Sequence, residues 1–250
     1  MSGHSKWSSI KHKKGAADAK RGKLFSKLSR AIIVAAREGG ADPEGNATLA
    51  TAIQKARDNS MPKDNIERAI ARGAGTSSDG EAYEHITYEG YGPSGVALFV
   101  EALTDNRNRT ASDVRHIFTK NDGSLGESGS VAWLFERKGV ILVAESVDED
   151  ELTLAAAEGG AEDVVREGSS FEVISAPDDL QAVRQALGAA GIAYESADLT
   201  MLPKTTVAIE DETSAKKLLR LLDALEENDD VQDVYANFDI PERVLETMTA

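Results

Sequence analysis

The residues best suited to bind another molecule lie at the start of the chain. Residues 1–30, here called the arm, hold nine lysines and arginines and the single acid Asp18, in a chain of 250 residues with a formal net charge of -15. The arm therefore carries +8, and the other residues carry -23. A basic arm on an acidic body attracts a polyanion at one end only, because the acidic body repels phosphates.

The arm combines cations with an aromatic ring and an imidazole. Lysine and arginine can track a phosphate backbone, and Trp7 can stack on a base. This composition favours nucleic acid, or something that carries it, over an ordinary solvated tail. The arm has no signature for reading base edges, so it does not separate DNA from RNA. The candidate nucleic-acid-binding residues are Lys6, Trp7, Lys11, His12, Lys13, Lys14, Lys20, Arg21, Lys23, Lys27 and Arg30.

A second polar segment, residues 104–110, joins an expected strand to an expected helix that Thr110 and Asp113 can open as a capping box. Its arginines could bind a phosphate or a carboxylate through paired donors. The alternative is a solvated loop whose Asn and Asp side chains satisfy the backbone, and both interpretations stay open. The candidate selectivity loop comprises Asn106, Arg107, Asn108 and Arg109.

The sequence offers little for catalysis. It has no Cys, which excludes thiol chemistry, disulfides and Cys-based zinc sites. Gly90–Gly95 matches G-x-G-x-x-G, but a strand is expected after it, which favours a hairpin turn over dinucleotide binding. The histidines have no metal-ligand spacing, and no Walker loop or G-x-S-x-G occurs. We therefore expect no enzyme, catalytic residue, metal site, cofactor or small-molecule substrate. The acidic clusters 148–151 and 226–230 indicate a charged helix start and a solvated helix end.

Helices are expected to position the arm, since residues 1–75 lack strand signals. Apolar residues at helical spacing predict an amphipathic helix over 18–37 with a basic side next to its apolar side. Asn46 can cap a second helix, and a third begins near Pro62 and ends at Gly73.

Beyond a Gly- and Ser-rich linker, strands and helices alternate. Residues 140–201 read βαββαβ, the order of a ferredoxin-like unit. The segments on either side, 96–135 and 205–238, each read βαβ and could together complete a second such unit. We predict a multi-domain α and α+β fold, with an N-terminal helical domain followed by two ferredoxin-like α/β domains, one inserted in the other. The predicted domains are the arm and helical domain 1–75, a discontinuous domain 83–136 plus 204–240, and an inserted domain 137–203.

Four long motifs, in the correct order, resemble those of the YebC/PmpR family. They are Ser2–Trp7 leading to Ile10–Lys14, Met61–Ile70, Tyr88–Pro93 and Thr104–Thr110. The resemblance covers nearly the whole chain and thins beyond Gly139. One departure is Ala47, where the family pattern has proline after the asparagine, which affects only how the second helix begins.

The resemblance implies a DNA-binding transcriptional regulator in the cytoplasm. Mitochondrial relatives in the family resemble translational activators, so the alternative is an RNA- or ribosome-associated regulator of translation. A metabolite-binding regulatory module is a third class. The start of the chain has no apolar leader, and no apolar run reaches membrane-spanning length, so we expect no membrane partner. The expected partners are DNA first and ribosomal RNA second.

Overall fold

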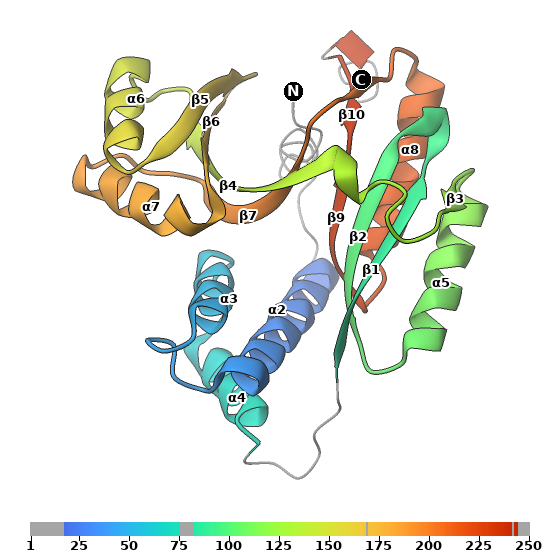
Figure 1. Cartoon of the computed structure of the whole chain (residues 1–250), viewed down its shortest axis with the longest axis horizontal. Helices are drawn as coiled ribbons and strands as arrows, with labels where there is room; N and C mark the ends of the chain where they lie inside the picture. The colour runs from blue at the N-terminus through green and yellow to red at the C-terminus, as the bar shows by residue number, and fades with distance from the viewer. Residues whose placement is uncertain (1–17, 76–82, 169, 242, 245–250) are drawn as a thin grey trace. The chain divides into compact units, whose positions relative to one another are not determined.

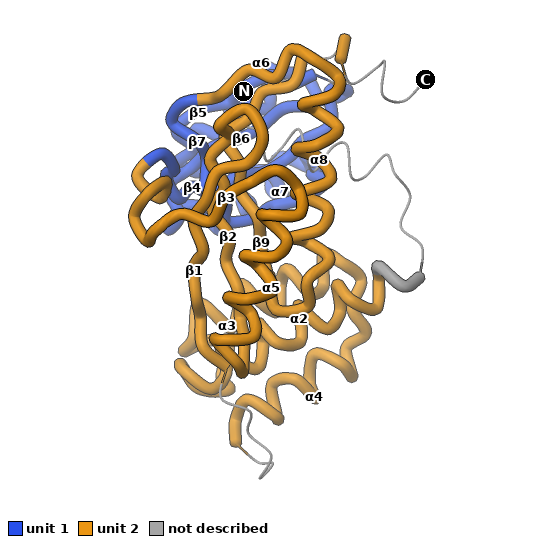
Figure 2. Tube along the Cα trace, turned by 90° about the vertical axis from the view of Figure 1, so that its right-hand side faces the viewer, with its two compact units in different colours: residues 1–2, 134–205 blue, residues 3–133, 206–250 orange. Residues whose placement is uncertain are grey.

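The computed structural model describes the chain except residues 1–17, 76–82, 169, 242 and 245–250. The arm residues from Lys6 to Lys14 lie outside the described part. The described residues form two compact units, one from Leu134 to Thr205 and the other from Asp18 to Trp133 together with Thr206 to Val244 (Figure 2). The three-domain division made from the sequence stays a prediction.

Among the described residues, three helices come first in the larger unit (Figure 1). They are α2 (Asp18–Gly39), α3 (Ala47–Asp58) and α4 (Lys63–Gly73). Their core contains Ile32, which is fully buried, and Leu49. Asn46 caps α3 as predicted, because its side-chain oxygen accepts the Leu49 N–H at 3.0 Å. Glycine is required at position 73, where a Cβ would lie 2.5 Å from the Ile33 carbonyl oxygen of α2.

The larger unit also contains a four-stranded sheet, with its strands in the order β3-β1-β2-β9. Neighbouring strands are antiparallel, and β1 and β2 form a hairpin around the short helix η1 (Pro93–Gly95). Helices α5 and α8 share a core with Leu98 and Val100 of β2. The elements are β1 (Glu84–Tyr91), β2 (Ala97–Thr104), α5 (Arg107–Lys120), β3 (Ser124–Leu125), α8 (Glu212–Glu226) and β9 (Val231–Ala236).

The smaller unit contains the predicted βαββαβ order. Its strands are antiparallel and lie in the order β5-β6-β4-β7, so the first and third strands are central, as in a ferredoxin-like unit. Its core includes Ile141, Phe171 and Val183. The elements are β4 (Phe135–Ala144), α6 (Glu149–Glu158), β5 (Ala161–Glu167), β6 (Ser170–Ser175), η3 (Pro177–Asp179), α7 (Leu180–Ala189) and β7 (Ser196–Pro203).

The predicted fold class, helices followed by α/β sheets, is confirmed, but the strands of the larger unit are arranged differently from the expectation. The segment 96–135, expected as βαβ, forms β2, α5 and the short strand β3, and the short helix η2 (Ala132–Leu134) follows. The segment 205–238, expected as βαβ, forms β8 (Val207–Ala208), α8 and β9, but β8 pairs with β10 (Phe238–Asp239) outside the main sheet. β1 pairs with β2 through the hairpin turn expected over Gly90–Gly95, because strands that are close in sequence pair readily through a short turn.

Candidate nucleic-acid interface

Helix α2 presents the part of the arm that the structure describes. Lys23, Lys27 and Arg30, here called the α2 cations, recur at spacings that place them on one side of the helix. Arg21 is exposed, with its guanidinium 5.7 Å from the ring centroid of Phe25. Lys20 lies on the same helix, and its side chain is not described.

The lysines of this group contact the C-terminal end of α8. Lys23 Nζ donates to the Glu227 carbonyl oxygen at 3.1 Å, and Lys27 Nζ donates to the Glu226 carbonyl oxygen at 2.6 Å. The last carbonyls of a helix have no partner within the helix and carry a partial negative charge, so cations there stabilise the helix. Both lysines thus cap the C-terminal end of α8 with hydrogen bonds to its last carbonyl oxygens.

Arg30 extends the same contact to the segment after α8. Its Nη1 donates to the carbonyl oxygens of Asp229 at 2.6 Å and Leu103 at 3.1 Å, and lies 3.3 Å from Asp230 Oδ1. The guanidinium also lies 5.1 Å from the ring centroid of Tyr83. The acidic run 226–230, expected as a solvated helix end, is therefore the region that the α2 cations bind.

The Asp230 side chain links several elements of the larger unit. It is buried, and its Oδ2 accepts bonds from Arg109 Nη2 at 2.8 Å, Thr110 Oγ1 at 2.7 Å and Thr104 Oγ1 at 3.3 Å. Burial raises the pKa of this carboxyl, but the bonds from Arg109 and Thr110, with the charge of Arg30, outweigh burial and leave the pKa below its usual range. Asp230 is thus charged and fully bonded at neutral pH.

The candidate selectivity loop is the first turn of α5. The Asn106 side chain accepts the Arg109 N–H at 3.1 Å and caps the helix, so the expectation of a start at a Thr110 and Asp113 capping box is wrong. Asn106 is held at this capping position because Thr104 Oγ1 accepts the Asn106 backbone N–H at 2.9 Å. Asn108 is exposed on the same turn.

The two arginines of this turn have different surroundings. Arg109 Nη2 lies 2.7 Å from Asp105 Oδ1, and with its bond to Asp230 these contacts raise the pKa of Arg109. Arg107 is exposed. Burial raises the pKa of Tyr88, and the nearby charge of Arg107 lowers that pKa by a smaller amount. Arg107 is therefore the arginine of this turn better placed for an external anion.

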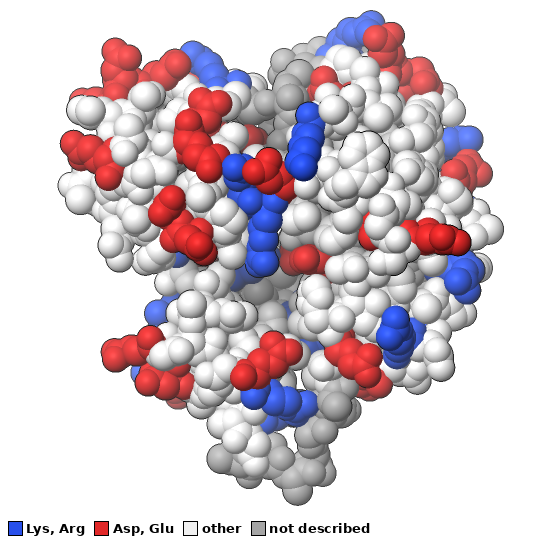
Figure 3. All heavy atoms as spheres, viewed as in Figure 1, with Lys and Arg blue, Asp and Glu red and all other residues white. Residues whose placement is uncertain are grey.

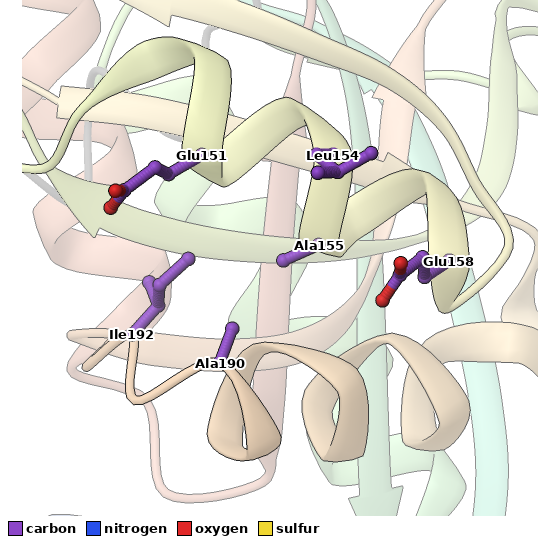
Figure 4. Close-up of a pocket in the computed structure, with 6 residues that line it drawn as sticks. All are labelled: Glu151, Leu154, Ala155, Glu158, Ala190 and Ile192. Carbon is purple, nitrogen blue, oxygen red and sulfur yellow. The ribbon is translucent and has the colours of Figure 1, made fainter.

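Other features of the described surface concern charge, hollows, metal binding and membrane contact. Figure 3 shows acidic side chains spread over the visible face. In the smaller unit, a hollow of about 250 Å³ lies between α6 and the end of α7, and is lined by apolar groups with Glu151 and Glu158 at its edge (Figure 4). Such a lining repels phosphate. Within the described residues, no cluster of His, Asp and Glu could hold a metal ion. Nor is any described helix long and apolar enough to cross a membrane.

The sequence interpretation missed the bonds around Asp230. Thr104 and Thr110 are both buried, and the Thr110 hydroxyl oxygen lies 2.7 Å from that of Thr104. The available signal was two threonines flanking a polar run, which identifies neither their partner nor their burial. Asp230 lies more than a hundred residues further along the chain.

Comparison with known proteins gives consistent matches over the whole length. Residues 5–76 match the family described as "TACO1/YebC protein N-terminal domain", and residues 83–238 match "TACO1/YebC second and third domain". A "Probable transcriptional regulatory protein" of Rubrobacter xylanophilus is 65% identical over 98% of both chains. Another of the same description, from Acidothermus cellulolyticus, is 59% identical over 98% of this chain and 99% of its own. The crystal structure of a conserved hypothetical protein from Aquifex aeolicus is 54% identical, with a TM-score of 0.80 over 90% of this chain and 93% of that one.

Proposed function

The chain belongs to the TACO1/YebC family, and from that premise we propose that it is a transcriptional regulator that binds DNA through its basic arm. Relatives described as probable transcriptional regulatory proteins support the regulatory role. The observation that carries the proposal is the charge partition, with +8 in residues 1–30 and -23 in the remainder. Only the arm offers a polyanion a concentrated positive field.

The contacts of the α2 cations divide the arm into two parts. Lys23, Lys27 and Arg30 contact the end of α8 and the segment that follows it. A phosphate would have to displace those contacts to reach them. We therefore assign most of the affinity to the basic residues before Lys23, which are Lys6, Lys11, Lys13, Lys14, Lys20 and Arg21.

Lysine acts as a point charge on phosphate, whereas base selectivity needs paired donors on base edges. The arm therefore supplies affinity with little sequence preference. Arg107, exposed on the first turn of α5, is the described residue we assign to selectivity. Arg109 contributes by fixing that turn, because it is held by Asp105 and Asp230.

Changing Lys11, Lys13 and Lys14 together to Glu tests the arm as the binding site. We expect affinity for duplex DNA to fall at least about tenfold at low salt, because phosphate contacts release counterions. The slope of log binding constant against log salt should become shallower by about 2.7, which is about 0.9 for each of three contacts. Fluorescence anisotropy with labelled DNA at several salt concentrations measures both quantities.

The matched control is Arg57, Arg115 and Lys120 changed to Glu, which alters the same charge at exposed positions outside the arm. This control should keep the slope of the unchanged protein. Equal affinity and slope in the arm variant would show that the arm is not the site. Binding of structured RNA in clear preference to DNA would replace transcription with the translational alternative.

A further inference from the structure

Two aromatic side chains project from the larger unit next to one loop carbonyl. Trp133 is 66% exposed, and Tyr91 is 38% exposed. The Tyr91 hydroxyl donates to the Ser130 carbonyl oxygen at 3.1 Å, and Trp133 Nε1 donates to the same oxygen at 3.2 Å. The polar edges of both rings therefore converge on one atom, which orients them while leaving ring surface in solvent. We call Tyr91 and Trp133 the aromatic pair.

A buried carboxylate fixes the loop that carries this carbonyl. Glu89 is 4% exposed, and its oxygens accept the N–H groups of Gly129 at 2.6 Å and of Val131 and Ala132 at 2.7 Å each. Burial raises the pKa of Glu89, but these three donors outweigh burial and hold the pKa below its usual range. Hydrogen bonds to a charged acceptor are strong. Residues on both sides of Ser130 are therefore held by one side chain.

The same loop also depends on backbone geometry. The Gly126 N–H donates to the Glu89 carbonyl oxygen at 2.7 Å, and Gly129 has φ of +86°, a conformation that favours glycine. Large aromatic side chains normally gain stability by burial. Here a buried charge, three N–H donors and a left-handed glycine hold a largely exposed tryptophan in place. This arrangement fits a binding surface better than it fits packing.

We propose that the aromatic pair is a stacking surface for unpaired bases of the nucleic acid whose phosphates the arm binds. This inference rests on the proposed function. Rigid aromatic faces can stack on any base, because every base has a π-face. Bases within a duplex already stack on their neighbours, so the ligand must present unpaired bases. Glu127, exposed in the same loop, disfavours a phosphate there, which leaves the base as the contacting group.

Stacking and phosphate binding make separable contributions. The arm contribution weakens with salt because counterions are released, whereas stacking displaces no counterion. Loss of a ring should therefore lower affinity without changing the salt slope. The competing partner is a proline-rich peptide, since proline also packs on aromatic rings. The proposed function favours the nucleic acid, and the experiment includes both.

The chain has two tryptophans, so Trp7→Phe leaves Trp133 as the only one. We expect its fluorescence to be quenched by single-stranded oligothymidine and not by blunt-ended duplex DNA of the same length. Trp133→Ala should lower affinity for the single strand about tenfold with an unchanged salt slope. Trp133→Phe, which keeps a ring, should lose less. The matched control is Leu154→Ala in the smaller unit, equally exposed at 66%, which should leave affinity unchanged.

Circular dichroism and thermal unfolding of each variant separate binding from folding, and Trp133→Phe keeps the test valid if Trp133→Ala unfolds. Unchanged single-strand affinity in folded Trp133 variants, with binding still lost in the arm variant, would overturn the stacking surface and leave the proposed function intact. Quenching by a proline-rich peptide with no response to the single strand would overturn it in favour of a peptide site. If the unchanged protein binds no nucleic acid, both proposals fail.

Discussion

Replacing Asp230 with Ala is expected to lower the free energy of unfolding by about 3 kcal/mol, since removing one member of a buried ion pair leaves its partners uncompensated. The Thr110 hydroxyl loses its carboxylate acceptor, and Arg109 loses the better shielded of its two carboxylates. Arg30 also loses its ion pair with the same side chain. Chemical denaturation followed by circular dichroism measures the change.

The neighbouring residue provides the control. Asp229 has a side chain that is 74% exposed and lies 3.9 Å from Lys23 Nζ, so Asp229→Ala should change stability by less than about 0.5 kcal/mol. Equal losses of stability in Asp229→Ala and Asp230→Ala would contradict the stabilising role of the buried Asp230 carboxylate. The folded Asp230→Ala variant should still bind nucleic acid, because the substitution does not affect the lysines and the arginine that precede Lys23 in the arm.

Acidic pH should reduce the difference in stability between the unchanged protein and Asp230→Ala. The pKa of Asp230 in the folded state lies below its value in the unfolded chain, so the unfolded state binds a proton first as pH falls. Its contribution is complete above about pH 5 and declines as pH falls below about 4 towards the lowered pKa. The stability difference between the unchanged protein and Asp230→Ala should therefore shrink at acidic pH.

Features with local signals could be predicted from the sequence. The Asn46 cap depends on a bond between residues three apart, and the helix carrying the arm depends on apolar spacing within a few turns. The strand order of the smaller unit follows from one contiguous βαββαβ segment. In each of these cases the residues that decide the structure are neighbours in the chain.

Features that depend on distant pairs could not be predicted in this way. Lys27 contacts the Glu226 carbonyl across 199 residues, and nothing in either segment identifies the other. An acidic run after a helix is usually solvated, so the general rule misled here. The β1–β2 hairpin, by contrast, agrees with the turn expected over Gly90–Gly95, because its two strands are neighbours in the chain.

The second large effect concerns Glu89, whose position in a strand gives no sign that it is buried. Glu89→Gln keeps the size of the side chain but replaces one acceptor oxygen with an NH₂ group, which cannot accept a bond from a backbone N–H. At least one of the three loop N–H groups is then unpaired, and the remaining bonds lose their charge. An unsatisfied buried donor costs about 1–3 kcal/mol, so we expect a loss of about 3 kcal/mol of stability.

The loop should respond more than the rest of the sheet. Amide exchange of Gly129, Val131 and Ala132 should become faster, because these N–H groups donate to the Glu89 carboxylate. Glu84→Gln, at an exposed position in the same strand, should leave stability and exchange unchanged. With Trp7→Phe in the background, the emission of Trp133 should also change in Glu89→Gln, since the ring is oriented by the Ser130 carbonyl. Faster exchange with single-strand affinity unchanged would mean that Glu89 stabilises the loop without positioning the aromatic pair for binding.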